Sequence, residues 1–102
     1  MVHKLKSIVK ELASEAIRLG AETLEVEYKD GFEEVFAVKG GVGYGIAKLR
    51  SSSREAASLR DELRWITKRK RRMTACDCEY ELRGRVYESF GENAFRVELR
   101  RV

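Results

Sequence analysis

Proline is absent from this 102-residue sequence, and histidine occurs once, at His3. The lack of proline indicates a chain without rigid linkers. The length fits one domain, residues 1–102, with a single modest core. Because a catalytic triad needs a base close to its nucleophile, one histidine excludes triads with a histidine base unless His3 folds back onto the domain.

Long apolar runs are also missing. No stretch approaches the ~18 apolar residues that a membrane-spanning helix needs. The first twenty residues are amphipathic and include Glu11 and Glu15. A signal peptide would need an uninterrupted apolar run there, so we expect a cytoplasmic protein with no membrane partner.

Cysteine is scarce, with only Cys76 and Cys78. Side chains two positions apart on a strand share a face, which predicts that both are small core residues. A zinc site would need two further ligands, and His3 is the only histidine. We therefore expect no metal and no cofactor.

Charged residues, in contrast, make up 37% of the sequence and give a net charge of +4. Acidic and basic residues balance over residues 1–50, so the whole excess lies in residues 51–102. Much of it is the run Lys68-Arg69-Lys70-Arg71-Arg72. Such a run can contact phosphates or an acidic protein surface, or it can be the solvated, dipole-favoured end of a helix.

The first forty residues predict a helix followed by a β-hairpin. Apolar residues at spacings of three and four predict a helix from about His3 to Leu19, which Gly20 ends in a left-handed cap. Alternation predicts a strand at Leu24–Tyr28 and a partner strand at Phe32–Val38. Asp30-Gly31 fits the tight type I′ turn between them.

The middle of the chain predicts a strand and a second helix. Val42–Leu49 is read as a third strand, or as a continuation of the second strand past a glycine bulge at Gly40-Gly41. Its glycines match neither the Walker pattern nor the dinucleotide fingerprint. Ser52 and Glu55 fit a capping box that starts a helix running to about Arg71.

The last third predicts two strands. Alternation runs through Cys76–Leu82, with a break at Gly84, and again through Phe95–Leu99. The expected fold is a single α+β domain of order α-β-β-(β)-α-β-β, with a mainly antiparallel sheet and both helices on one face. The expected core comprises Leu12, Ile17 or Leu19, Val26, Phe36, Leu59, Leu63, Ile66, Tyr80, Val97 and Leu99.

Paired carboxylates are one arrangement that can carry acid–base chemistry. They occur at Glu25/Glu27 and at Glu33/Glu34. A catalytic pair needs burial that separates the two pKa values, whereas we expect these acids on the polar, solvated faces of a hairpin. The sequence therefore predicts no catalytic residue and no enzymatic activity.

The order of elements resembles the regulatory domain that precedes the motor domain in type II secretion and type IV pilus assembly ATPases. The similarity rests on LGAETLEVE at residues 19–27, Val38-Lys39-Gly40, Gly84-Arg85, and Val97-Glu98-Leu99-Arg100. It covers about residues 5–102. The resemblance implies the fold and a regulatory or interaction role.

The departures from that family concern the nucleotide. Its second strand carries arginines that reach the nucleotide phosphates, where this chain has Val35 and Ala37. Its Asp-Gly corresponds to Lys39-Gly40, and the motor domain with its Walker motifs is absent. Arg85 and Arg100 alone match arginines of the family. We therefore expect neither nucleotide hydrolysis nor tight ATP binding.

Two functions follow as hypotheses. The first is a small non-enzymatic interaction or regulatory domain, linked to a secretion or pilus ATPase system, that binds a protein partner or itself through an exposed sheet edge at the first hairpin. The second is weak nucleic-acid binding without sequence preference, because contacts to phosphates read no base edges. Its candidate contacts are Arg64, Lys68, Arg69, Lys70, Arg71, Arg72, Arg85 and Arg100, with Arg83 and Arg101 in support.

Overall fold

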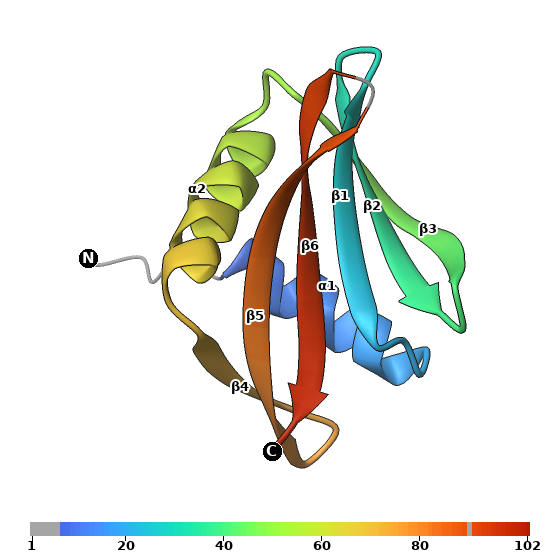
Figure 1. Cartoon of the computed structure of the whole chain (residues 1–102), viewed down its shortest axis with the longest axis vertical. Helices are drawn as coiled ribbons and strands as arrows, with labels where there is room; N and C mark the ends of the chain where they lie inside the picture. The colour runs from blue at the N-terminus through green and yellow to red at the C-terminus, as the bar shows by residue number, and fades with distance from the viewer. Residues whose placement is uncertain (1–6, 90) are drawn as a thin grey trace.

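The computed structural model describes residues 7–89 and 91–102 (Figure 1). In chain order its elements are α1 (Ile8–Arg18), β1 (Thr23–Lys29), β2 (Phe32–Lys39), β3 (Val42–Arg50), α2 (Arg54–Lys68), β4 (Arg71–Ala75), β5 (Cys78–Ser89) and β6 (Glu92–Arg101). The α+β class and the antiparallel sheet agree with the sequence prediction. The sequence does not predict the short strand β4, because it places the end of the second helix at about Arg71 and the start of the next strand at Cys76.

The strands form one antiparallel sheet in the order β3-β2-β1-β6-β5-β4. β1 and β6 pair in the middle, where Val26 lies opposite Phe95, and they join the two halves of the chain (Figure 1). The edges are therefore β3 and β4. The expectation of an exposed edge at the first hairpin is wrong, because β3 covers β2 and β6 covers β1.

The turns of the first half follow the sequence closely. Asp30 and Gly31 have φ angles of 50° and 83°, as a type I′ turn requires. Gly40 and Gly41 form a second such turn, with φ angles of 57° and 81°. Since this turn reverses the chain, Val42–Arg50 is a separate third strand and not a continuation of β2.

Helix α1 is capped at both ends. The Lys10 backbone N–H donates to Ser7 Oγ at 3.1 Å, and the Val9 N–H donates to Glu62 Oε2 of α2 at 2.7 Å. Gly20 follows the helix with φ of 80°, as predicted. The predicted start at His3 lies outside the described residues. Of the two alternatives for the core, Ile17 is buried, whereas Leu19 is 48% exposed.

Helix α2 is shorter than predicted at both ends. Its N-cap is Ser53 and not Ser52, because Ser53 Oγ accepts the Ala56 N–H at 3.1 Å. The helix ends at Lys68, since Arg69 takes an extended conformation with φ of −142° and ψ of 133°. The prediction that Arg71 lies on the helix is therefore wrong, and Arg71 begins β4.

Both helices pack on the same face of the sheet, and the core lies between the two layers (Figure 1). Most of the predicted core is buried there, namely Leu12, Ile17, Val26, Leu59, Leu63, Ile66, Val97 and Leu99. Tyr80 is half-buried against this core. Phe36 is not part of it, because Val35 and Ala37 point to the helices and Phe36 points to the opposite, open face.

The two cysteines do not share a core face, and this prediction is wrong. Cys76 and Asp77 form the turn between β4 and β5, with φ angles of 51° and 61°. Cys76 is exposed, and Cys78 is half-buried at the start of β5. The alternation that suggested one strand through Cys76 in fact crosses a reversal of the chain.

β5 continues through Gly84 without the predicted break. A Cβ placed on Gly84 would lie 3.0 Å from Ile66 Cγ2 and 3.2 Å from the Thr67 backbone nitrogen. Glycine is needed here because the last turn of α2 rests directly on the strand. Among the described residues, no helix is both long and apolar enough to cross a membrane.

Candidate functional site

The two edges of the sheet differ in length and charge. β4 has five residues, and Arg71 and Arg72 are exposed on it. Short, charged edge strands discourage pairing with another chain. β3 has nine residues and no charged side chain from Val42 through Ala47. β3 is therefore the less protected edge of the described sheet.

Two large apolar side chains are exposed on β3. Val42 is 53% exposed and Tyr44 is 52% exposed. Tyr44 lies opposite the buried Ala37, which places it on the side of the sheet that the helices cover. This side of the edge can offer apolar contact to a further strand.

Gly43 and Gly45 occupy the other side of β3, opposite Val38 and Phe36. Neither has a positive φ angle, and a Cβ on either would lie no closer than 3.7 Å to Phe36. The fold itself therefore does not require glycine at these two positions. The remaining six glycines have structural reasons, since Gly84 touches α2 and the other five have positive φ angles, namely Gly20, Gly31, Gly40, Gly41 and Gly91.

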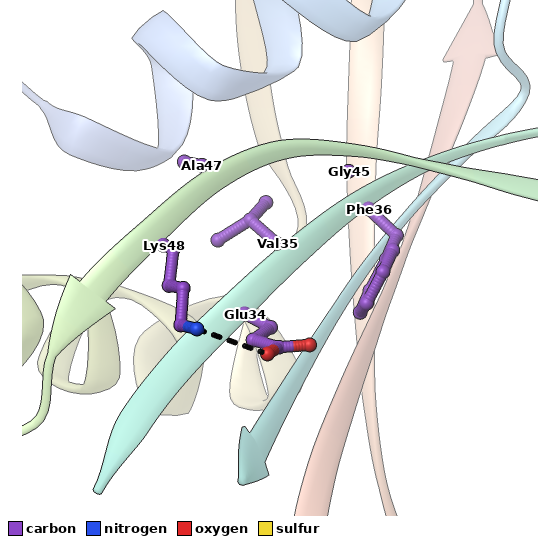
Figure 2. A pocket seen from close by; sticks show the side chains of 6 residues that line it. All are labelled: Glu34, Val35, Phe36, Gly45, Ala47 and Lys48. Carbon is purple, nitrogen blue, oxygen red and sulfur yellow. Dashed lines mark ion pairs between the residues drawn. The ribbon is translucent and has the colours of Figure 1, made fainter. Parts of the chain in front are cut away.

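A hollow of about 360 Å³ lies on the sheet surface beside Gly45 (Figure 2). Between the pairs Val35–Ala47 and Phe36–Gly45, β3 has one extra residue, Ile46, so the strand bulges here. Figure 2 shows the lining residues, which are Glu34, Val35, Phe36, Gly45, Ala47 and Lys48. Phe36 also borders a second hollow of about 220 Å³ next to Gly43.

A polar cluster lies farther along the open face. Tyr87 on β5 donates its hydroxyl to Glu25 Oε1 at 3.1 Å, with Glu27 Oε1 at 3.5 Å. Arg96 contacts Glu25 at 3.4 Å and lies over the Tyr87 ring. Burial, and then the bond to Glu25, raise the pKa of Tyr87 to about 12. The Tyr87 hydroxyl therefore keeps its proton at neutral pH and donates a hydrogen bond to Glu25, which is itself paired with Arg96. This bond joins β5 to β1 and stabilises the sheet.

The second carboxylate pair is split between the two faces, contrary to the expectation that both acids are solvated. Glu33 is 6% exposed on the helix side. It accepts from Ser51 Oγ at 2.7 Å and lies 3.7 Å from Arg60 of α2. Glu34 points to the open face and pairs with Lys48 at 3.9 Å. Glu33 therefore joins β2 to α2.

The eight candidate basic contacts do not form one site. Arg64 and Lys68 are on α2, and Arg69 and Lys70 connect it to β4. Arg71 shares the helix side of β4 with the buried Met73, whereas Arg72 alternates onto the open face. The register also places Arg85 of β5 and Arg100 of β6 on the open face, as it does Arg83. The sheet therefore separates the two groups of cations.

Ion pairs further reduce the number of unpaired cations near the C-terminal end of α2. Arg64 lies 3.6 Å from Asp61, and Lys70 lies 3.9 Å from Glu81. Among the described acids, none lies within 4.0 Å of Lys68, Arg69 or Arg71. These three cations, together with Trp65, are called the Trp65 surface below.

Trp65 is the residue that the sequence reasoning missed. It is 63% exposed and lines a hollow of about 340 Å³ together with Arg69, Lys70 and Arg71. Its position could have been read from the helical period. Each helical residue turns by about 100°, which places Trp65 about 200° from the buried Leu63.

Within residues 7–89 and 91–102, no group of three or more His, Cys, Asp or Glu side chains is placed to hold a metal ion. No protein-family model matches the chain, and no curated protein matches its sequence. The resemblance to the ATPase regulatory domains therefore stays a prediction. The β3 edge and the Trp65 surface are the two parts of the described structure that suggest a binding function.

Proposed function

We propose that this chain is a small non-enzymatic interaction domain that binds an extended segment of a partner protein along β3. The observation that carries the proposal is the pair Gly43 and Gly45, two glycines that neither backbone geometry nor crowding demands. An added strand would pair with the outer backbone groups of β3, which is the binding mode of β-augmentation.

The side chains beside β3 specify the chemistry of the bound segment. On the open face, the glycines leave room against Phe36, so a large apolar side chain of the added strand fits there. On the helix side, Val42 and Tyr44 offer apolar contact. Successive residues of a strand alternate between these faces. The segment should therefore carry apolar residues on both of its faces.

The resemblance noted in the sequence supports a class of partner to test first. Regulatory domains of that family act beside an ATPase motor, so components of secretion or pilus assembly systems are the first candidates. The chain would then regulate by binding, without nucleotide chemistry of its own. The β3 edge supports the proposal independently of this resemblance.

The test compares two matched lysine substitutions, one on each edge of the sheet. Tyr44→Lys places a charge on β3, and Thr74→Lys places one on β4. A partner captured from cell extract is identified, purified and titrated against each variant by calorimetry. We expect Tyr44→Lys to weaken binding at least tenfold and Thr74→Lys to leave it within about twofold, because charge on an edge strand opposes pairing.

Two further measurements locate the contact. Gly45→Leu fills the hollow beside Phe36 and should also weaken binding, and hydrogen exchange at the β3 amides should slow in the complex. Equal binding by Tyr44→Lys and Thr74→Lys would contradict the proposal, as would a monomer that captures no partner. A dimer in light scattering that Tyr44→Lys dissociates would identify a second copy of this chain as the occupant.

A further inference from the structure

We propose that the Trp65 surface binds single-stranded nucleic acid, with one base stacked on the indole and the phosphates contacted by Lys68, Arg69 and Arg71. This site is separate from the β3 edge. It lies at the C-terminal end of α2 and the start of β4, which is the opposite edge of the sheet (Figure 1).

The indole is available because of its place on α2. Leu63 and Ile66 face the core, so Trp65 between them points outward and is 63% exposed. An exposed aromatic ring is a stacking platform, and base–aromatic stacking is worth about 1–3 kcal/mol per base. Every base has a π-face, so such a contact does not select sequence.

The cations around the ring are available for the same ligand. Arg69 and Arg71 line one hollow with Trp65, and Lys68 lies one helical turn after it. None of the three has a described acid within 4.0 Å, so no carboxylate of the described residues pairs with these cations in place of a phosphate. Lys70 also lines the hollow, but it is 3.9 Å from Glu81.

These features favour single strands over duplexes. In a duplex the bases are stacked on one another, so an indole on a protein surface can reach only the backbone. A single strand offers both phosphates and unstacked bases. The open face of the sheet does not add a second basic surface, because its arginines alternate with acids, as in the pairs Arg72–Glu79 and Arg83–Glu81.

Trp65 is the only tryptophan of the chain, so its fluorescence reports on this site alone. The probe is a twenty-nucleotide oligothymidine. Adding this oligonucleotide at low salt should quench the tryptophan emission. In the reverse titration, adding the protein to a fluorescently labelled oligothymidine should raise the anisotropy of the label over the same concentration range. Three phosphate contacts to a single strand predict a log–log salt slope of about −2.

The variants separate stacking from charge. Trp65→Ala should lower the affinity about 5- to 150-fold, which corresponds to a stacking contribution of about 1–3 kcal/mol, and Trp65→Phe should restore much of it. Lys68→Glu with Arg69→Glu should abolish binding. The matched control, Arg85→Glu with Arg100→Glu, changes net charge equally on the open face and should keep the affinity within about threefold.

Four outcomes would overturn the inference. They are no binding at low salt, binding without quenching, equal affinity of wild type and Trp65→Ala, and tighter binding of a duplex of the same length. Competition by polyglutamate as strong as that by oligothymidine would instead identify an acidic protein as the ligand. All substituted side chains are exposed, so we expect every variant to fold. Circular dichroism of each variant checks that the fold is retained.

Discussion

Replacing Gly84 by alanine tests how closely α2 rests on the sheet. The new Cβ would lie 3.0 Å from Ile66 Cγ2, 3.2 Å from the Ile66 carbonyl carbon and 3.2 Å from the Thr67 nitrogen. Two of these atoms belong to the helix backbone, so no change of rotamer relieves the contact. The last turn of α2 must move away from β5, which loosens the buried Ile66.

The magnitude follows from two opposing terms. Alanine stabilises a strand position with compatible backbone angles by about 0.4–1 kcal/mol relative to glycine, chiefly through the unfolded chain. Inserting a methyl group into a packed interface costs about 1–3 kcal/mol. We therefore expect Gly84→Ala to lower the free energy of unfolding by on the order of 1–2 kcal/mol.

Urea denaturation followed by circular dichroism measures this change, with the denaturation midpoint lowered and the slope unchanged. Gly43→Ala is the matched control, because its Cβ would meet Phe36 at an ordinary 3.7 Å. This control should be neutral or stabilising. If Gly84→Ala is as stable as Gly43→Ala, then α2 does not pack on β5 at this distance, and the reasoning fails.

Three further predictions concern polar groups and one turn. Glu33→Ala should lower the free energy of unfolding in urea by about 1–3 kcal/mol, because Ser51 and Arg60 lose their partner. The control Glu34→Ala should change it by less than about 0.5 kcal/mol. The pKa of Tyr87 is raised from 10.0 to about 12, so the folded state favours the neutral phenol and the free energy of unfolding should fall as pH rises from about 10 through 12. Tyr87→Phe should lack this contribution to the fall in stability, and it should lack the phenolate absorbance step of Tyr87. Asp77→Gly should raise the melting temperature and increase the free energy of unfolding by roughly 0.5–1 kcal/mol, because Asp77 has a φ angle of 61°, which glycine adopts more readily. An unchanged melting temperature would count against strain in this turn.

Local signals account for the parts of the fold that the sequence predicted well. Asp30-Gly31 supplies both positive φ angles of its turn, and the alternation on either side needs no knowledge of the rest of the chain. The helix cap at Gly20 is also fixed locally, by a glycine with a positive φ angle directly after the helix. Such features are fixed by residues within a few positions of one another, so a sequence pattern is enough to place them.

The face assignment of β2 could not be read in the same way. Phe36 and Val38 alternate on one face, and Val35 and Ala37 alternate on the other, so both faces are apolar. The helices decide which set is buried, and they cover Val35 and Ala37. Glu33 falls on the buried side as a consequence. Its position is possible because Ser51 and Arg60, both distant in sequence, reach its carboxylate.

The basic run was misplaced for a different reason. Lysine and arginine are good helix formers, so nothing between Lys68 and Arg72 signals the end of a helix. The end is imposed by the pairing of β4 with β5, where Arg71 lies opposite Leu82. The turn that permits this pairing is Cys76-Asp77, and neither residue is glycine. The split of the candidate basic residues between two faces therefore depends on a turn with no recognisable signal.

The β3 edge leads to a last prediction, in which stability and binding change in opposite directions. Gly43 and Gly45 have no positive φ angle, and Cβ atoms there would lie 3.7 Å and 4.0 Å from Phe36. Alanine at both positions should therefore stabilise the chain, by roughly 1–2 kcal/mol together in urea denaturation. The same methyl groups narrow the room beside Phe36, so the double variant should bind the partner segment more weakly. Glycines kept at a stability cost are expected where binding requires the space. A double variant that is less stable than wild type would show that the fold needs these glycines, and they would then no longer argue for a binding edge.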